Sequence, residues 1–282
     1  MTTNSNIQKF RKELRTIANA NRLELLGILN TTPDSFYDGG ENYSPEKAIQ
    51  AGLQMISDGA FIIDIGGQSS RPGAPTISAK EEWSRVEPVI SGILKSEQSA
   101  YISIDTYRSD VAKKAVNAGA VLVNDISAGS IDPLMFSVVA ELGVPYVLMH
   151  MRGTPETMQN NPVYGNVVED MKGFFERKLD ELDKLGVEDV VLDPGFGFGK
   201  TLDDNYKILR FLNEFKIFDK PILSGISRKS MIYKAIDCEA VDALNGTTAL
   251  NMISAVNGAS LLRVHDIAEA REVSILHNHL YK

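Results

Sequence analysis

Eight short apolar segments recur along the sequence, separated by helix-length amphipathic segments. The apolar segments are 23–29, 61–66, 101–105, 121–125, 146–150, 189–193, 221–225 and 260–265. Most are rich in Val, Ile and Leu without polar alternation, which is typical of strands buried on both faces. Strands that alternate with helices form parallel sheets, and eight such units fit the roughly 250 residues of a TIM (β/α)8 barrel.

The segments between these strands carry residues that typically begin and end helices. In 44–59, Ser44 is a predicted N-cap, Pro45 is the first helical residue and Gly59 follows the end. A doubly wound open sheet is the alternative, but it gathers ligand residues mainly at one switch point. Here unusual residues follow nearly every strand. We therefore predict a single α/β barrel domain over 22–282, with 1–21 as an N-terminal extension that either covers the barrel bottom or is disordered.

Composition excludes several classes of protein. The 282 residues are 43% hydrophobic, enough for a large core, and the net charge of −8 argues against a nucleic-acid-binding surface. No apolar run approaches the roughly 18 residues of a membrane-spanning helix, and the N-terminus lacks the apolar stretch of a signal peptide. The single cysteine, Cys238, suits a reducing compartment. We expect a cytoplasmic protein that binds neither nucleic acid nor membrane.

Polar residues stand at the end of each predicted strand, or just after it. In strand order they are Asn30; Ser70 and Arg71; Asp105; Asn124 and Asp125; His150; Asp193; Arg228, Lys229 and Ser230; and Arg263 and His265. In a TIM barrel the carboxyl ends of all strands meet at one face, where active sites are built. The sequence therefore predicts a ring of functional side chains at that face.

Two sets within this ring suit different chemical groups. Arg263 and His265 are two positions apart, so both side chains can point to the same side and, with Asn30, hold a phosphate or diphosphate. A diphosphate normally brings Mg²⁺, for which one amide oxygen of Asn30 is a sufficient protein ligand. The second set is Asp105, Asn124 and Asp193. These side chains suit a flat heterocycle with several N–H donors, and Lys229 can donate to the same ring system.

The segment "LDPGFGFGKT", Leu192 to Thr201, looks like a phosphate-binding P-loop. That motif needs glycine where this chain has Pro194, which has no N–H to donate. We interpret the segment as the sixth strand–helix loop, with Asp193 at its base. Its glycines would shape the turn and allow ring atoms to approach the backbone, and Phe198 would supply an apolar wall.

Eight ordered motifs together resemble the dihydropteroate synthase family: "GILNTTPDSFYDGG", "DIGGQSSRPGA", "SIDTY", "NDISA", "MHMRGTPETMQ", "LDPGFGFGK", "SRKS" and "RVHD". The resemblance extends from about Leu26 to the C-terminus. It implies a sulfonamide-target enzyme of folate and tetrahydrofolate biosynthesis, a transferase that joins 4-aminobenzoate to 6-hydroxymethyl-7,8-dihydropterin diphosphate. The products are 7,8-dihydropteroate and diphosphate.

The resemblance also assigns roles to individual residues. It implies the following sets: Asn30 as the Mg²⁺ ligand; Asp105, Asn124, Asp193 and Lys229 for the pterin; Asn30, Ser70, Arg263 and His265 for the diphosphate; Ser70, Arg71, Pro72, Phe198 and Ser230 for aminobenzoate; Asp34, Phe36 and Arg71 in loops that close over the substrates; and Arg263, His265, Lys229 and Asp105 in catalysis. A homodimer is expected, with its interface on the late helices.

One motif departs from the family pattern. The usual E-S-T-R-P-G is here Gln68-Ser69-Ser70-Arg71-Pro72-Gly73, which keeps a hydroxyl at position 70 but loses a methyl group and an acid. The change alters either loop packing or sulfonamide discrimination. It also leaves open a drug-insensitive variant. A catalytically silent pterin-binding protein is an alternative of a different class, but it would be signalled by loss of Asn30, Arg263 or Lys229, and all three are present. Another alternative is a corrinoid-dependent methyltransferase domain, which has no need of "SRKS" and "RVHD" for a diphosphate.

The remaining histidines and charged residues have simpler interpretations. His150 is expected to satisfy a backbone carbonyl, while Asp125 either holds the fourth loop together or touches a ligand. Lys229 as a Schiff-base nucleophile would not explain the phosphate set. We expect His277 and His279, in the C-terminal helix, to lie on the surface.

Overall fold

Eight parallel strands form a nearly closed barrel. The computed structural model describes residues 2–19, 22–32, 44–69, 75–154, 158 and 163–281. The strands are β1 (Glu24–Asn30), β2 (Ile62–Gly66), β3 (Tyr101–Asp105), β4 (Leu122–Asp125), β5 (Tyr146–Met149), β6 (Val190–Asp193), β7 (Leu223–Ser224) and β8 (Leu261–Val264). Their order is β6-β5-β4-β3-β2-β1-β8-β7. Each strand overlaps one predicted apolar segment, so the predicted strands are confirmed.

The two ends of this sheet meet between β6 and β7. Leu192 and Ile222 form a parallel bridge, and the Leu192 N–H donates to the Pro221 carbonyl at 2.9 Å. An open doubly wound sheet would leave both edge strands apart, whereas here they approach each other. The predicted (β/α)8 barrel is confirmed.

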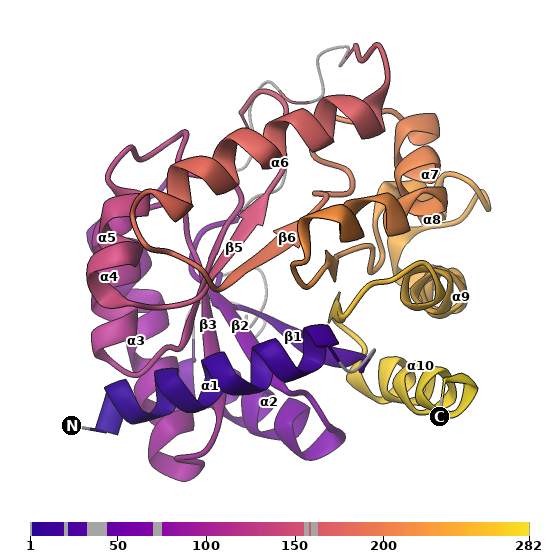
Figure 1. The fold of residues 1–282 in the computed structure, drawn as a ribbon. Helices are drawn as coiled ribbons and strands as arrows, with labels where there is room; N and C mark the ends of the chain where they lie inside the picture. Colours follow the sequence, from indigo (N-terminus) through magenta and orange to yellow (C-terminus); the bar gives the residue numbers. More distant parts are fainter. Residues whose placement is uncertain are drawn as a thin grey trace.

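Helices surround the strands largely in chain order (Figure 1). They are α2 (Pro45–Asp58), α3 (Ala79–Ser96), α4 (Ser109–Asn117), α5 (Met135–Leu142), α6 (Val167–Asp183), α7 (Leu202–Arg210), α8 (Ser230–Tyr233), α9 (Leu244–Val256) and α10 (Ile267–Leu280), with 3-10 turns at Leu212–Phe218 and Ala240–Asp242. Ser44 occupies the N-cap position of α2 in extended conformation, without a side-chain capping hydrogen bond; Pro45 is the first helical residue, and Gly59 ends the helix at φ 110°. The predicted helix boundaries are therefore confirmed here.

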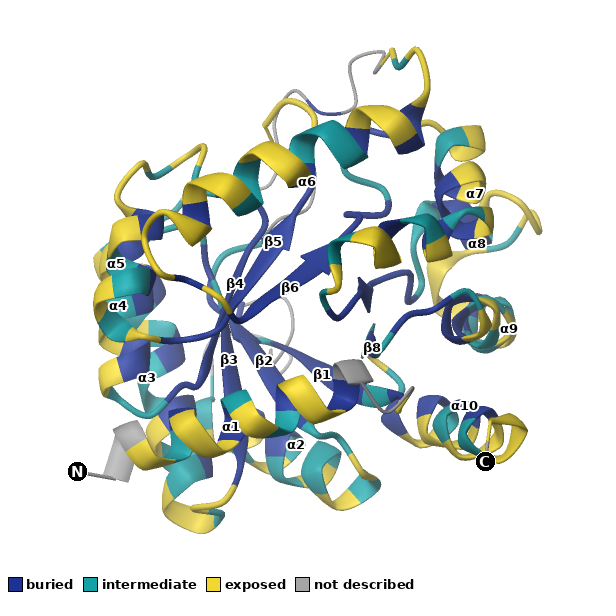
Figure 2. Ribbon diagram, in the orientation of Figure 1, coloured by how far each residue is buried: buried dark blue, intermediate teal, exposed yellow. Residues whose placement is uncertain are grey.

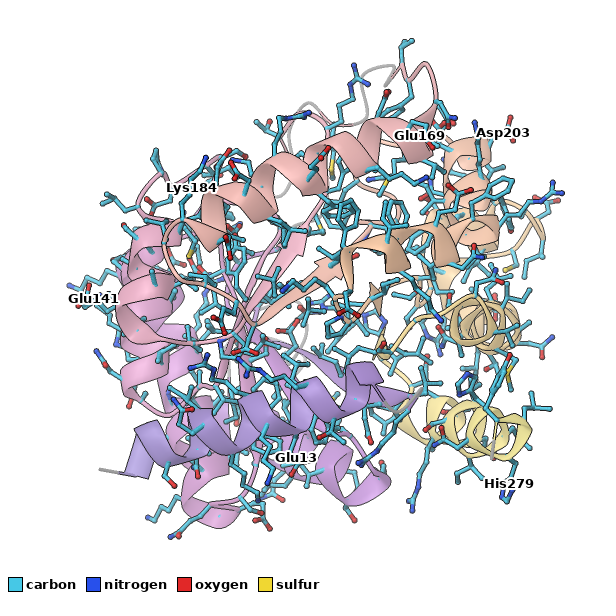
Figure 3. All side chains as sticks on the ribbon, in the orientation of Figure 1. Glu13, Glu141, Glu169, Lys184, Asp203 and His279 are labelled. Carbon is cyan, nitrogen blue, oxygen red and sulfur yellow. The ribbon has the colours of Figure 1, made fainter. Side chains whose placement is uncertain are left out.

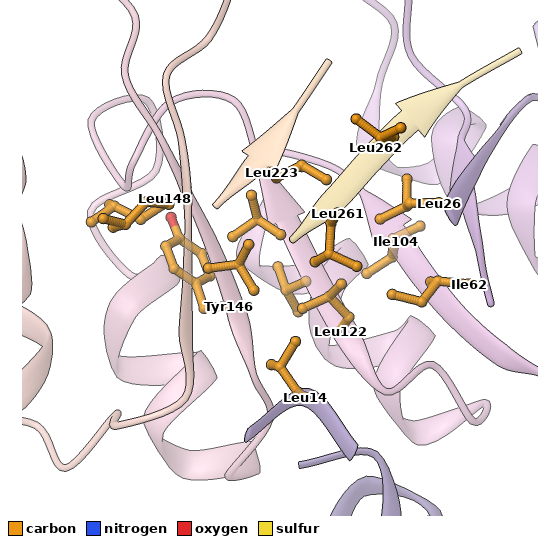
Figure 4. Close-up of a cluster of buried hydrophobic side chains, with 14 of the residues drawn as sticks. Leu14, Leu26, Ile62, Ile104, Leu122, Tyr146, Leu148, Leu223, Leu261 and Leu262 are labelled. Carbon is orange, nitrogen blue, oxygen red and sulfur yellow. The ribbon is translucent and has the colours of Figure 1, made fainter. Parts of the chain in front are cut away.

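Helix α1 (Thr2–Asn19) lies across one end of the barrel (Figure 1). Phe10, Leu14 and Ile17 are buried, and the Phe10 ring lies 5.0 Å from the ring of Tyr101, the first residue of β3. Figure 4 shows Leu14 reaching the cluster that includes Leu122 and Leu261, the first residues of β4 and β8. The helix therefore covers the amino-terminal end of the strands. The N-terminal extension was expected either to cover the bottom of the barrel or to be disordered, and its described residues 2–19 cover the bottom of the barrel.

Charge also fixes α1 to this end of the barrel. Asp189, just before β6, accepts hydrogen bonds from Nε of Arg11 at 2.5 Å and Nε of Arg15 at 2.6 Å. Burial raises the pKa of Asp189, but the hydrogen bonds from Arg15 and Arg11 prevail and hold that pKa below its usual value. Asp189 therefore stays ionised beneath the helix.

The strands form the buried centre of the molecule, and the outer faces of the helices are exposed (Figure 2). With α1 covering the amino-terminal end, polar residues at the carboxyl ends lie at the opposite face. In the part of the chain that the structure describes, no helix is both long and apolar enough to cross a membrane.

Candidate active site

The strand register brings three of the predicted site residues to one level. Asn30 on β1 pairs with Gly66 on β2, Gly66 pairs with Asp105 on β3, and Asp105 pairs with Asn124 on β4. Asp193 ends β6, and Arg263 lies on β8. The predicted ring at the carboxyl ends of the strands is therefore present for these residues, because closing the sheet places every strand end around one opening.

Arg263 is held by two carboxylates inside this ring. Its Nε donates to Oδ2 of Asp64 and its Nη2 donates to Oδ2 of Asp105, each at 2.7 Å. Asn124 Nδ2 donates to the same Asp64 oxygen at 2.9 Å. Asp64 was not predicted as a site residue. The available signal was its position in "FIIDIG", where an acid interrupts an otherwise apolar strand.

Burial and charge perturb the carboxyl groups of the ring. Removal from water raises the pKa of Asp105 to about 7, opposed by the nearby Arg263 and assisted by the charge of Asp64. Burial also raises the pKa of Asp193, against the charge of Lys229 and the Gly195 N–H, which donates at 2.7 Å. Arg263 remains charged, because the carboxylates of Asp64 and Asp105 outweigh the effect of burial on its pKa.

Lys229 lies at the same opening, just before α8. Its Nζ donates to the Phe196 carbonyl at 2.6 Å and stands 4.7 Å from the centre of the Phe198 ring. Burial lowers the pKa of Lys229 to about 8, with Asp193 opposing and Arg263 adding to the decrease. Phe198 therefore contacts the lysine, and its predicted role as an apolar wall for aminobenzoate stays a prediction.

His265 follows β8 and is exposed. Its Nδ1 lies 3.0 Å from the Ser227 hydroxyl, whose oxygen also accepts a hydrogen bond from the His265 N–H at 3.3 Å. Partial desolvation and then the positive charge of Arg263 lower the pKa of His265 to about 4. The imidazole is neutral near pH 7, so His265 acts there as a hydrogen-bonding group. Ser227, which orients the ring, was not predicted.

The glycine-rich loop after β6 is built around Lys200. The buried Nζ donates to the carbonyls of His150 at 3.0 Å, Gly195 at 2.8 Å and Phe198 at 3.0 Å. Its ammonium group therefore binds the loop itself. This arrangement agrees with the sequence argument against a P-loop. Lys200 stands where the P-loop motif has its phosphate-binding lysine, but its Nζ donates to three backbone carbonyls.

The glycines of this loop allow two segments of the chain to pack closely. At Gly195, φ is +64° and a Cβ would lie 2.2 Å from the His150 carbonyl oxygen; at Gly199, φ is +65° and a Cβ would lie 2.4 Å from the Arg152 carbonyl oxygen. The backbone of the glycine-rich loop thus approaches the backbone of the segment after β5 closely. Approach of a ligand ring to these glycines stays a prediction.

Several other expectations can be compared with the structure. Asp125 accepts hydrogen bonds from the Ser127 and Gly129 N–H groups and from the Tyr146 hydroxyl, so it holds the fourth loop together. The expectation for His277 was wrong: this residue is buried in α10, because that helix packs against α9, β1 and α2. His279 is exposed as expected and projects outward (Figure 3).

Other predicted residues have less defined surroundings. Ser230 is half-buried as the first residue of α8, and Asn30 is half-buried at the end of β1. Asp34, Phe36, Ser70, Arg71 and Pro72 lie outside the described residues, so their predicted roles remain predictions. Over the described ranges, no group of three or more His, Cys, Asp or Glu side chains is arranged to hold a metal ion.

Three comparisons place this geometry among known proteins. Residues 26–265 match the pterin binding enzyme family. A dihydropteroate synthase of Synechocystis sp. is 46% identical over 255 residues, covering 89% of this chain and 88% of the relative. A Yersinia pestis dihydropteroate synthase solved in complex with a sulfonamide drug superposes with a TM-score of 0.87 at 38% identity, covering 92% of this chain and 94% of that one. A Xanthomonas albilineans dihydropteroate synthase solved with 4-aminobenzoic acid has a TM-score of 0.86 at 36% identity, covering 92% of this chain and 93% of that one.

Proposed function

The chain belongs to the pterin-binding enzymes and, within them, to the dihydropteroate synthases, and from this premise we propose how its residues divide the reaction. The reaction condenses 6-hydroxymethyl-7,8-dihydropterin diphosphate with 4-aminobenzoate to give 7,8-dihydropteroate and diphosphate, a step of folate biosynthesis. The observation that carries this function is the ring of Asp105, Asn124, Asp193, Lys229 and Arg263 at one barrel opening. A corrinoid-dependent methyltransferase would not explain the 46% identity to a synthase.

The pterin ring would be held by the buried acids and the amide of this ring. Ionised carboxylates accept two parallel N–H bonds from an amino-amidine edge, which suits Asp193 and Asp105. The Lys229 ammonium, with its pKa lowered to about 8, remains a donor for a ring carbonyl or nitrogen. Asn124 can offer its amide oxygen to the ligand, because its Nδ2 is engaged with Asp64.

The diphosphate would lie near Arg263 and His265. Two of the five N–H donors of the Arg263 guanidinium bind Asp64 and Asp105, and the others remain for phosphate oxygens. Asn30 and Ser70 would complete this set, and Ser70, Arg71, Pro72, Phe198 and Ser230 would contact aminobenzoate. The loops with Asp34, Phe36 and Arg71 would exclude water from the reacting carbon.

The described residues fit Mg²⁺ only as an ion that arrives with the diphosphate. They contain no cluster of three or more acidic, histidine or cysteine side chains that could hold it alone. Mg²⁺ keeps several waters and takes phosphate oxygens readily, so the amide oxygen of Asn30, half-exposed at the end of β1, suffices as a protein ligand. The ion would supply charge neutralisation of the leaving diphosphate.

Catalysis would rest mainly on electrostatics. The aromatic amine is unprotonated at neutral pH, so no general base is required for its attack. The difficult step is departure of diphosphate from the pterin methylene carbon, which leaves positive charge on the ring system. Asp105 and Asp193 favour that charge, while Arg263 and His265 stabilise the leaving anion.

A homodimer through the last two helices is part of this proposal. Ile253 and Val256 are exposed on α9, three residues apart, and Leu276 and Leu280 are exposed on α10, four residues apart. Each pair therefore lies on one helix face. Helices α9 and α10 pack side by side at one edge of the molecule (Figure 2). A second copy would cover these apolar side chains, and Leu276→Glu should then lower the mass measured by sedimentation.

The single cysteine, Cys238, is not in a disulfide, and we propose a cytoplasmic location on that basis.

Diphosphate release tests the function directly. Wild-type protein with Mg²⁺ and 6-hydroxymethyl-7,8-dihydropterin diphosphate should release diphosphate in response to 4-aminobenzoate, and Arg263→Ala should abolish that response. Arg11→Ala is the matched control, since Arg11 also binds a carboxylate but lies at the opposite end of the barrel. Absence of aminobenzoate-dependent release in wild type, with pterin binding retained, would instead support the silent pterin-binding protein.

A further inference from the structure

Asp64 is a buried acid in the middle of β2 to which no role has been assigned. It has no solvent exposure, and all five residues of β2 are buried. Its Oδ2 accepts hydrogen bonds from Arg263 Nε at 2.7 Å and from Asn124 Nδ2 at 2.9 Å. One carboxylate oxygen thus joins a residue proposed for the diphosphate to a residue proposed for the pterin.

These contacts cross the interior of the barrel. In the sheet order, β4 and β8 each lie two strands from β2, on opposite sides of it. Alternate strands of a TIM barrel contribute side chains to the same interior layer, which is why Asp64, Asn124 and Arg263 can meet. The contact is therefore a consequence of closing the sheet and not of proximity along the chain.

We infer that Asp64 is a positioning residue, which holds Arg263 and Asn124 in one fixed relation and so couples the two halves of the site. The inference rests on the proposed function. With Nε on Asp64 and Nη2 on Asp105, the planar guanidinium of Arg263 is fixed at two points, which lie 199 and 158 residues away along the chain, respectively. A phosphate arriving at the remaining donors meets a preorganised group.

A purely structural purpose explains Asp64 less well. Burying a carboxylate is costly even when it is paired, and well-packed apolar side chains commonly replace buried ion pairs without loss of stability. The other residues of β2 are apolar or glycine. An acid at this position is therefore explained by what it holds, and both of its partners belong to the proposed site.

The charge of Asp64 also reaches Asp105. It raises the pKa of Asp105, because a neighbouring negative charge disfavours ionisation, while Arg263 lowers it. Charged or titratable groups that act on Asp105 come from several elements: Arg263 on β8, Asp64 on β2, Glu82 on α3, Asp125 on β4 and Lys229 before α8. Removing the Asp64 charge alone should thus lower the pKa of Asp105.

Asp64→Asn tests the inference, with Asp189→Asn as its matched control. Both acids are buried and bound by arginine, but Asp189 lies under α1 at the opposite end of the barrel. We expect Asp64→Asn to reduce kcat/KM for the pterin diphosphate about 100-fold, since a displacement of about 1 Å in a catalytic group has this effect. It should also move the acidic limb of the kcat/KM profile to lower pH. Asp189→Asn should keep kcat/KM and the profile of wild type.

A double variant keeps the test valid if Asp64→Asn does not fold. Asp64→Asn combined with Arg263→Gln removes both charges of this ion pair, so neither partner is left in the core without the other. If Asp64 acts through Arg263, adding Asp64→Asn to Arg263→Gln should change kcat/KM far less than it does in wild type. Independent, multiplicative effects of the two substitutions, or an Asp64→Asn variant with the wild-type pH profile and kcat/KM, would overturn the inference.

Measurements of ligand binding distinguish a failure of this inference from a failure of the proposed function. The affinity for free 6-hydroxymethylpterin and for magnesium pyrophosphate can be measured by calorimetry without turnover. If wild type binds both but releases no diphosphate in response to aminobenzoate, the proposed function fails. Weaker binding of both ligands to Asp64→Asn, but not to Asp189→Asn, would still support positioning by Asp64; unchanged binding would overturn it.

Discussion

The Asp105 carboxylate and the Arg263 guanidinium are joined at 2.7 Å, between Oδ2 and Nη2, although β3 and β8 are separated by two other strands. The ion pair does not restore the pKa of Asp105 to the usual value of an aspartate. Burial of Asp105 outweighs the attraction of Arg263, and its pKa is about 7. This relationship makes the site sensitive to pH near neutrality.

The pH dependence of activity should therefore show an acidic limb near pH 7. An ionised Asp105 accepts N–H bonds from the pterin, so kcat/KM should rise as pH increases through about 7. Asp105→Asn should have low activity and no such limb. A limb near the ordinary pKa of an aspartate, about 4, would contradict the assignment.

The same shift predicts the sign of a stability change. Folded Asp105 holds its proton up to about pH 7, whereas an unfolded aspartate loses it near pH 4. Because the native state binds more protons between these values, the contribution of Asp105 to the free energy of unfolding decreases as pH rises from about 4 to 7. Chemical denaturation of wild type and Asp105→Asn at several pH values between 4 and 7 measures the difference between their free energies of unfolding. This difference should change with pH over that range, and a difference that does not depend on pH there would show that the pKa of Asp105 is not raised.

Lys200→Met should destabilise the loop after β6. The substitution keeps the length of the side chain but leaves the carbonyls of His150, Gly195 and Phe198 without their common donor. We expect a loss of about 2–4 kcal/mol in the free energy of unfolding, measured by urea denaturation. Lys207→Met, at an exposed position on α7, is the control and should change stability by less than about 0.5 kcal/mol.

Gly195→Ala and Gly186→Ala separate backbone strain from steric clash. Both glycines have positive φ, +64° and +79°, but a Cβ at Gly186 would meet nothing within 4 Å. Gly186→Ala should cost about 1–2 kcal/mol, the penalty of a left-handed conformation for an L-residue. At Gly195 the added Cβ would also meet the His150 carbonyl oxygen at 2.2 Å. Its cost should be clearly larger, and equal losses in thermal unfolding would contradict the packing described here.

Gln68→Glu tests the departure from the family motif. The Gln68 amide donates to the carbonyls of Ser69 at 3.0 Å and Pro75 at 3.1 Å, while its Oε1 accepts from the Ile77 N–H at 2.9 Å. A carboxylate cannot donate, so we expect a loss of about 1–3 kcal/mol in stability at neutral pH, with an increased KM for aminobenzoate. Gln50→Glu, at an exposed position on α2, controls for the added charge. Unchanged stability and KM would show that the Gln68 amide does not fix this segment.

Much of the site was predictable because it follows from local pattern and one topological rule. The strand segments are apolar and lack alternation, and parallel strands end at a common edge. The sequence alone therefore predicts that Asp105, Asn124, Asp193 and Arg263 lie at the same face of the barrel. The sequence also argues against a P-loop in the segment 192–201, because Pro194 replaces the first glycine of that motif.

Other features depend on contacts between distant segments. The sequence alone determined the eight strands, the barrel and the face on which the polar strand ends gather, because hydrophobic periodicity reports which faces must be buried. Only the tertiary structure decided that Asp64 binds Arg263 and Asn124, that Ser227 orients His265 and that His277 is buried. Those relations arise when the sheet closes and helices pack against it, and no local spacing encodes which side chains then meet across the interior.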